Sequence, residues 1–126
     1  MEGVIAAEQC YAKLDVLVPR FAVSDFPTSL ELRCGTVCWL DKPGLMEESK
    51  VVSVFVRDVV VCDVFVLFFG KTKELRIETK TMKVAFKVVN EEATSSWLLH
   101  FQVLLSFFSL FVFWLTFSQS SSVLLL

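Results

Sequence analysis

The segment that decides the architecture of this chain is Trp97-Leu-Leu-His-Phe-Gln-Val-Leu-Leu-Ser-Phe-Phe-Ser-Leu-Phe-Val-Phe-Trp-Leu-Thr-Phe117. As a helix, these 21 residues extend about 31 Å, which matches the hydrocarbon core of about 30 Å in a typical bilayer. The segment contains neither Pro nor Gly, so a continuous helix can satisfy every backbone hydrogen bond within lipid. The sequence therefore predicts a transmembrane helix over residues 97–117.

The polar and aromatic residues of this segment fit such a span. His100 and Gln102 fall in the first two turns, close to the headgroups, and two tryptophans fall near the ends, as interfacial aromatics do. A buried core helix, or a strand pair rich in Phe, is the alternative in a soluble protein. The residues expected to mark the span are Trp97, His100, Phe107, Phe108, Phe111, Phe113, Trp114 and Phe117.

Charge divides the chain into two parts. Every Asp, Glu, Lys and Arg lies between Glu2 and Glu92, and the net charge is −2. We therefore expect a single-span membrane protein with a small β-rich N-terminal body and one C-terminal transmembrane α-helix. Its expected parts are a body over 1–92, a polar linker over 93–96, the helix over 97–117 and a short tail over 118–126. The absence of a basic cluster argues against nucleic acid as a partner.

The flanks of the span predict its orientation. Lys83 and Lys87 precede the span and no Lys or Arg follows it, so the positive-inside rule keeps the N-terminus in the cytosol. The first eight residues lack the basic region of a secretory signal peptide. This layout is typical of an integral, tail-anchored membrane protein.

The body is expected to be rich in strands, because Leu30–Cys34 alternates apolar and polar residues and Val37–Leu40 resumes the pattern after Gly35. The turn residues Asp41–Gly44 end that strand. Further expected elements are a short strand Val16–Val18 ended by Pro19, a loop over Ser24–Ser29, and a short N-terminal helix over Gly3–Lys13.

The segment Val51–Phe69 has two interpretations. Its hydropathy allows a second membrane span near 51–69, but Arg57, Asp58 and Asp63 would each cost about 2.5–3.5 kcal/mol at a helix centre. Its many valines favour two strands instead, Val51–Val56 and Val59–Phe69, separated at Arg57-Asp58.

A hairpin should follow this segment. Gly70–Lys73 predicts the connection, and Leu75–Val89 alternates with a change of parity near Thr79–Thr81. Because a one-residue slip moves every side chain across a sheet, a break is expected there. Lys80, Lys83 and Lys87 should face water.

The chain lacks the residue patterns of common active sites. Cys34 and Cys38 have a spacing that zinc sites permit, but no second ligand pair exists. The single histidine, His100, lies in the predicted span, so no Ser-His-Asp or Cys-His arrangement can form in the body. We expect neither an enzyme nor a cofactor, metal or small-molecule substrate.

Two function classes follow. The first is a small tail-anchored membrane protein whose partners are the lipid bilayer and an unidentified protein bound by the body. The second is the product of an open reading frame without a selected function, carrying a fortuitous transmembrane segment. The second rests on biased composition, with 13 Phe against one Tyr and one His.

Overall fold

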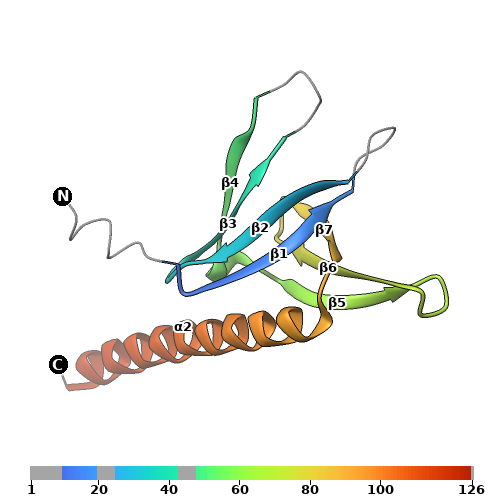
Figure 1. Ribbon diagram of the computed structural model, residues 1–126. Coiled ribbons are helices and arrows are strands. Elements are labelled where there is room, and N and C mark those ends of the chain that lie inside the picture. The colour runs from blue at the N-terminus through green and yellow to red at the C-terminus, as the bar shows by residue number, and fades with distance from the viewer. Residues whose placement is uncertain (1–9, 20–24, 43–47, 126) are drawn as a thin grey trace.

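Seven antiparallel strands and one long helix form the chain in the computed structural model, which describes residues 10–19, 25–42 and 48–125 (Figure 1). The strands are β1 (Ala12–Val18), β2 (Phe26–Leu32), β3 (Thr36–Asp41), β4 (Lys50–Phe55), β5 (Val61–Leu67), β6 (Thr72–Glu78) and β7 (Lys83–Val88). A 3-10 turn, η1 (Val56–Asp58), precedes β5, and the helix α2 spans Glu91–Leu125.

The sheet joins two consecutive meanders. Strands β1 to β4 pair in sequence, strands β5 to β7 pair in sequence, and β7 joins β1 through the pairs Val16↔Val88 and Leu17↔Lys87. The resulting order is β4-β3-β2-β1-β7-β6-β5. The sheet curves, and α2 runs past β1 and β5 (Figure 1). The predicted β-rich body is thus an antiparallel sheet, and one apolar C-terminal helix follows it.

The core forms because alternate residues of the strands share one face. Leu14 and Val16 of β1, Leu30 of β2, and Leu75 and Ile77 of β6 are all buried. Across the core, the rings of Trp39 and Phe86 meet edge to face with centroids 5.2 Å apart. This geometry connects the two meanders through aromatic packing as well as through the β1–β7 pairing.

The two-strand interpretation of residues 51–69 is confirmed, but the second strand ends at Leu67 and not at the predicted Phe69. The structure has β4 and β5 with η1 at the predicted Arg57-Asp58 break. Val56 and Val59 on either side of the break are buried, whereas Arg57 and Asp58 are exposed. The alternative of a second membrane-spanning helix here is wrong, because these valines fill the core of a sheet.

The break near Thr79–Thr81 is also confirmed, between the end of β6 and the start of β7. The Thr79 hydroxyl oxygen accepts hydrogen bonds from the backbone N–H of Thr81 at 3.3 Å and of Met82 at 3.1 Å. The turn therefore closes through a side chain, as Ser and Thr often do outside regular structure. Lys83 and Lys87 are exposed at the surface, as expected.

Two expectations near the N-terminus need correction. The loop over Ser24–Ser29 is wrong from Phe26 onward, because β2 begins there and pairs with β1, and the Ser29 hydroxyl donates to Asp15 at 2.8 Å. The helix over Gly3–Lys13 lies outside the described residues up to position 9, and Ala12 and Lys13 are strand. Residues 43 and 44 of the predicted Asp41–Gly44 turn also lie outside the described residues.

The strand order leaves β4 and β5 at the two edges of the sheet. On β5, the Asp63 carboxylate accepts a hydrogen bond at 2.8 Å from the backbone N–H of Val64. An edge strand otherwise offers such donors to another strand. One backbone donor of this edge is therefore already occupied by a local side chain.

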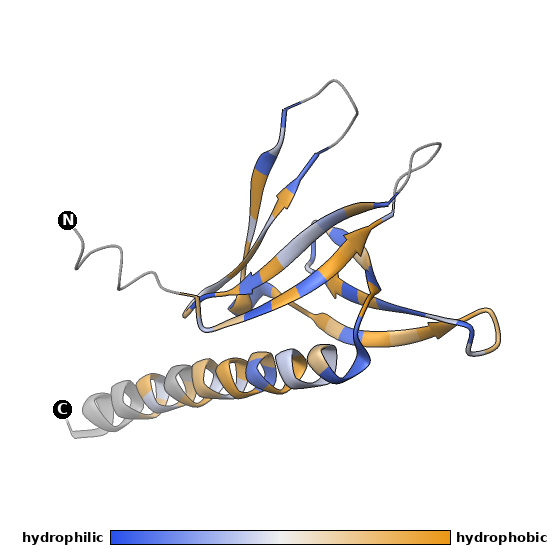
Figure 2. Cartoon of the chain, viewed as in Figure 1, coloured by the Kyte–Doolittle hydropathy of each residue, from blue (hydrophilic) through white to orange (hydrophobic). Residues whose placement is uncertain are grey.

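The connection between β5 and β6 is a strained, apolar turn, which we call the hairpin tip (Phe68–Lys71). Phe68, Phe69 and Gly70 have φ angles of 51°, 55° and 88°, a left-handed region that is costly for phenylalanine. Phe68 is 72% exposed and Phe69 is fully exposed. Figure 2 shows this tip as an apolar end of a projecting hairpin.

Candidate functional site: the C-terminal helix

The start of α2 is fixed by a side-chain cap. The Asn90 Oδ1 accepts a hydrogen bond from the Ala93 N–H at 3.0 Å, and the Thr94 hydroxyl donates to the Asn90 carbonyl at 2.7 Å. Glu91 and Glu92 place negative charge in the first turn, where it complements the helix dipole. Residues 93–96, expected as a polar linker, therefore lie inside the first turns of α2.

The first half of α2 covers the open side of the core. One stripe of side chains at three- and four-residue spacing packs against the sheet, which is the pattern of an amphipathic helix. The buried members are Thr94, Trp97, Leu98 and Phe101, and the partly buried members are Leu104, Leu105 and Phe108. We call residues 91–108 the lid, because they close the hydrophobic core of the body.

Trp97, the first residue of the predicted span, lies inside this core. It is 2% exposed, and its ring stacks on Phe101 with centroids 5.9 Å apart. Its indole Nε1 has no hydrogen-bond partner within the described part of the chain. The large aromatic surface of Trp97 therefore contributes to the body rather than standing on the outside of the helix.

His100 lies on the side of the lid next to β1. Its Nδ1 is 2.7 Å from the Ser96 carbonyl oxygen, and its ring meets Tyr11 edge to face with centroids 5.3 Å apart. The imidazole is thus held between its own helix and the residue before β1. Apart from Tyr11, no acid, base or nucleophile is in contact with it among the described interactions.

The second half of α2 leaves the body. Its aromatic side chains Phe113, Trp114 and Phe117 are between 60% and 70% exposed, and the rings of Phe113 and Phe117 stack with centroids 6.5 Å apart. Phe107, on the outer side of the lid, is 63% exposed. Phe108 is half-buried against the core, and the side chain of Phe111 lies outside those described. We call residues 109–125 the free half.

By length and composition, the 27-residue stretch Glu91–Phe117 of α2 could cross a membrane. The body leaves most of the apolar surface of this stretch exposed. An isolated exposed apolar side chain is common in soluble proteins, but a contiguous run over several turns is not. The structure therefore brings the predicted span residues onto one helix, with Trp97 in the body core and Phe113, Trp114 and Phe117 exposed.

The cysteines do not gather into a metal site. All four are unpaired thiols, and no group of three metal-ligating side chains occurs within residues 10–19, 25–42 and 48–125. Cys34 and Cys38 both line a surface cavity of about 520 Å³ beside Glu31 and Arg33. Hydrogen bonding to the Cys38 thiol, and then to Glu31, raises the pKa of Arg33, so this guanidinium stays charged.

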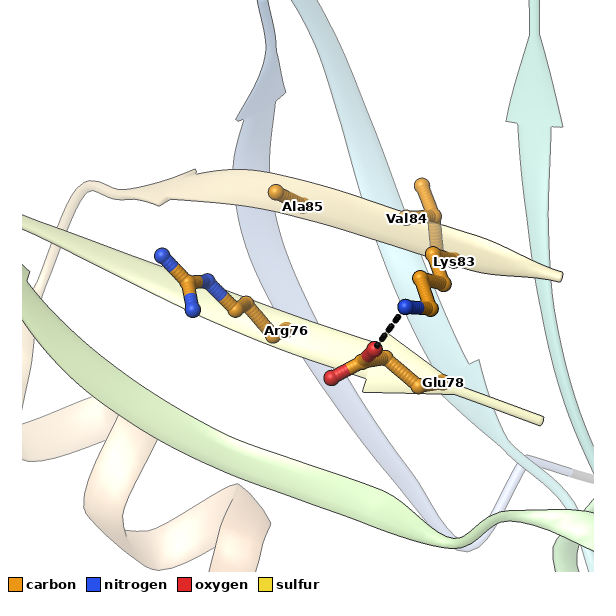
Figure 3. Close-up of a pocket in the computed structure, with 5 residues that line it drawn as sticks. All are labelled: Arg76, Glu78, Lys83, Val84 and Ala85. Carbon is orange, nitrogen blue, oxygen red and sulfur yellow. Dashed lines mark ion pairs between the residues drawn. The ribbon is translucent and has the colours of Figure 1, made fainter. Parts of the chain in front are cut away.

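A second surface cavity, of about 310 Å³, lies on β6 and β7 (Figure 3). Lys83 and Glu78 form an ion pair across it at 3.7 Å, and Arg76 pairs with Glu74 and lies over the Phe65 ring at 4.3 Å. These charges are matched by neighbours. The cavity therefore presents no unpartnered group for a ligand among the side chains that line it.

Sequence reasoning did not foresee the lid. The signals were present in the Asn90 cap and in the spacing of Thr94, Trp97, Phe101 and Phe108. The apolar residues on every other face of the segment concealed that stripe. No protein-family model matches the chain, and no curated protein matches it in sequence.

Proposed function

We propose that this chain is a tail-anchored membrane protein in which α2 holds a β-rich cytosolic body against a lipid bilayer. The observation that carries the proposal is the exposed, apolar surface of the free half, from Leu110 to Phe117. That surface is costly in water and stable in hydrocarbon. No charged residue follows Glu92, so insertion requires no buried charge.

The direction of α2 is consistent with an N-terminus in the cytosol. Basic residues Lys83 and Lys87 lie on β7, just before the helix, and none lies after it. Positive residues are retained on the cytosolic side of a membrane. The proposal therefore assigns the sheet, both surface cavities and the hairpin tip to the cytosol.

The proposed role of the body is to bind a protein rather than to catalyse a reaction. The hairpin tip supports this role, because Phe68 and Phe69 expose their rings on a projecting turn. Strained backbone is often found at contact sites. In Figure 1 the tip projects from the opposite end of the body to that from which the free half leaves, so it points away from the anchoring membrane.

The anchor is tested by alkaline carbonate extraction of membranes carrying the full chain with an N-terminal tag. The matched control ends at Phe108, which keeps the lid and removes the free half. We expect the full chain to stay in the membrane pellet and the control to be released. Release of the full chain would contradict the proposal.

The role of the tip is tested by proximity labelling from the same tagged chain. Phe69→Ser should remove a subset of the labelled cytosolic proteins, because the exposed Phe69 ring is proposed to make the main contact with the bound protein. The control is Val60→Ser, which changes another exposed apolar residue, 63% exposed, away from the tip. An unchanged set of labelled proteins in Phe69→Ser would exclude the tip as a contact.

A further inference from the structure

The lid and the predicted span compete for the same residues. Trp97 and Phe101 are 2% and 1% exposed, and both pack in the core of the body. A span over 97–117 would place these two rings in the bilayer and leave a hole in the core. The body would then expose apolar residues at η1 such as Val56 and Val59, which are buried in the same cluster.

The contacts show where this competition ends. Phe108 is the last residue of α2 described as packed against the core. Beyond it, Ser109, Leu110 and the aromatic residues from Phe113 onward are exposed. The side chains described after Phe108, at positions 109, 110 and 113–117, can therefore enter lipid without leaving the body.

We propose that the bilayer begins after Phe108, so that residues 91–108 remain the lid and residues 109–125 form the membrane segment. This inference rests on the proposed anchoring function. The 17 residues of the free half extend about 26 Å as a helix, at the lower end of the lengths that span a bilayer. The segment is thus shifted by about three turns from the predicted 97–117.

An unbroken helix also sets which surface of the body meets the membrane. The structure has α2 continuous from Glu91 to Leu125, with no hinge between lid and free half. One end of the body contains two segments that touch α2. Tyr11 contacts His100, and η1 packs on the helix. Hydrogen bonds from Tyr11 N–H to Leu32 and from Val56 N–H to Gly35 join these segments.

This end carries the side chains that lipid headgroups favour. Tyr11 is 51% exposed and Phe55 is 53% exposed, and the Arg57 guanidinium lies 5.1 Å from the centre of the Phe55 ring. Aromatic rings and arginine are enriched at the membrane–water interface. We call Tyr11, Phe55 and Arg57 the rim and assign it to the headgroup layer of the anchoring bilayer.

Two matched variants test the shifted segment. Phe107 is the central residue of 97–117, whereas Phe117 is the central residue of 109–125. Their exposures are 63% and 62%, so neither substitution disturbs the core. In carbonate extraction of the full chain, Phe117→Asp should lower the inserted fraction about tenfold or more, and Phe107→Asp should lower it far less.

The reverse ranking, or equal losses, would overturn the shift. The shift is also overturned if neither variant loses insertion while the unmodified chain inserts, because another element would then hold the membrane. If alkaline carbonate releases the unmodified chain from the membrane, the anchoring function itself is refuted. The two failures are therefore distinguishable in one experiment.

The rim is tested with the full chain in phosphatidylcholine vesicles containing a phospholipid that carries a photoreactive headgroup. We expect crosslinks at Phe55–Arg57 to exceed those at Phe68–Phe69 several-fold. The tip is the internal control, because its two phenylalanines are more exposed than Phe55. Equal crosslinking at both places, or more at the tip, would overturn the assignment of the rim to the headgroup layer.

Discussion

The two halves of α2 are both rich in apolar residues, but they have different surroundings. In residues 91–108, one stripe that includes Trp97 and Phe101 is buried under the sheet. In residues 109–125, the described aromatic side chains, such as Phe113 and Trp114, are mostly exposed. One continuous helix therefore has a half whose apolar surface the body uses and a half whose apolar surface it leaves open.

One apolar run can thus contain two kinds of segment, one that packs in a core and one that remains exposed. Hydropathy measures how well residues tolerate lipid, but it does not register which of them a neighbouring sheet already covers. The packing stripe in the lid has the three- and four-residue spacing of a globular core helix. Substitutions in the two halves should therefore differ in their effect on stability as the two halves differ in exposure.

The largest effect is expected at the two tryptophans of α2. Trp97→Ala should lower the free energy of unfolding by about 3–5 kcal/mol, because it removes a fully buried aromatic ring and leaves a cavity. Trp114→Ala should change it by less than about 0.5 kcal/mol, because Trp114 is 60% exposed. Pulse proteolysis of the full chain in mild detergent with increasing urea measures both, and equal losses would contradict the division of α2.

A smaller effect is expected at Cys62, which is partly buried against the core. Burial, and then the nearby Asp63 charge, raises the pKa of Cys62 to about 12 from its ordinary 9.0. Since the thiolate is the nucleophile, alkylation of Cys62 at pH 8 should be slow. Trp97→Ala should accelerate this alkylation about tenfold, which corresponds to lowering the pKa of Cys62 by about one unit. Trp114→Ala should leave the rate unchanged.

Mass spectrometry of alkylated peptides measures this rate, with the exposed Cys34 as the internal reference. The same shift has a consequence for stability. Below pH 9 both folded and unfolded thiols are protonated, so Cys62 adds no pH dependence. As the pH rises from 9 toward 12 the unfolded thiol ionises first, and the folded state should lose stability.

The next effect concerns the helix cap. Asn90→Ala should lower the free energy of unfolding by about 1 kcal/mol, because the Ala93 N–H loses its acceptor at 3.0 Å. Gln102→Ala, at an exposed helix position, is the control and should have little effect. An Asn90→Ala variant as stable as the control would show that the sheet alone fixes where α2 starts.

The smallest effect is expected at the hairpin tip. Phe69→Asn should raise the free energy of unfolding by about 0.5 kcal/mol, because asparagine tolerates a positive φ better than phenylalanine does. The fully exposed Phe69 ring makes no buried contact that the change could remove. A loss of stability in the same urea experiment would show that this ring packs on the body.

Period-two alternation allowed most of the sheet to be predicted. The division of 51–69 and the break at Thr79–Thr81 followed from local polarity, because a charged pair or a parity change disrupts a strand. The start of strand β2 was predicted at Leu30 and lies at Phe26, because Pro27 and the threonine and serine after it are typical of a loop. Its pairing with β1, which no local pattern encodes, overrides that preference.

The helix was predicted as an element, but its role in the core was not. Residues 91–96 looked like the end of a charged body followed by a linker, although Asn90 and two glutamates are a helix-start signal. Trp97 looked like an interfacial aromatic because it begins the apolar run. Its burial depends on where the sheet lies, which is tertiary information that a single segment does not contain.

The Asp63 carboxylate on the edge strand has a consequence for how this chain behaves at high local concentration. Valine-rich strands at an open edge nucleate stacking of identical chains into fibrils. With the Val64 N–H bonded to Asp63 at 2.8 Å, an incoming copy of β5 meets a negative charge and one missing donor. Many copies crowded together would thus encounter a local barrier to fibril nucleation, which a change as small as Asp63→Val would remove.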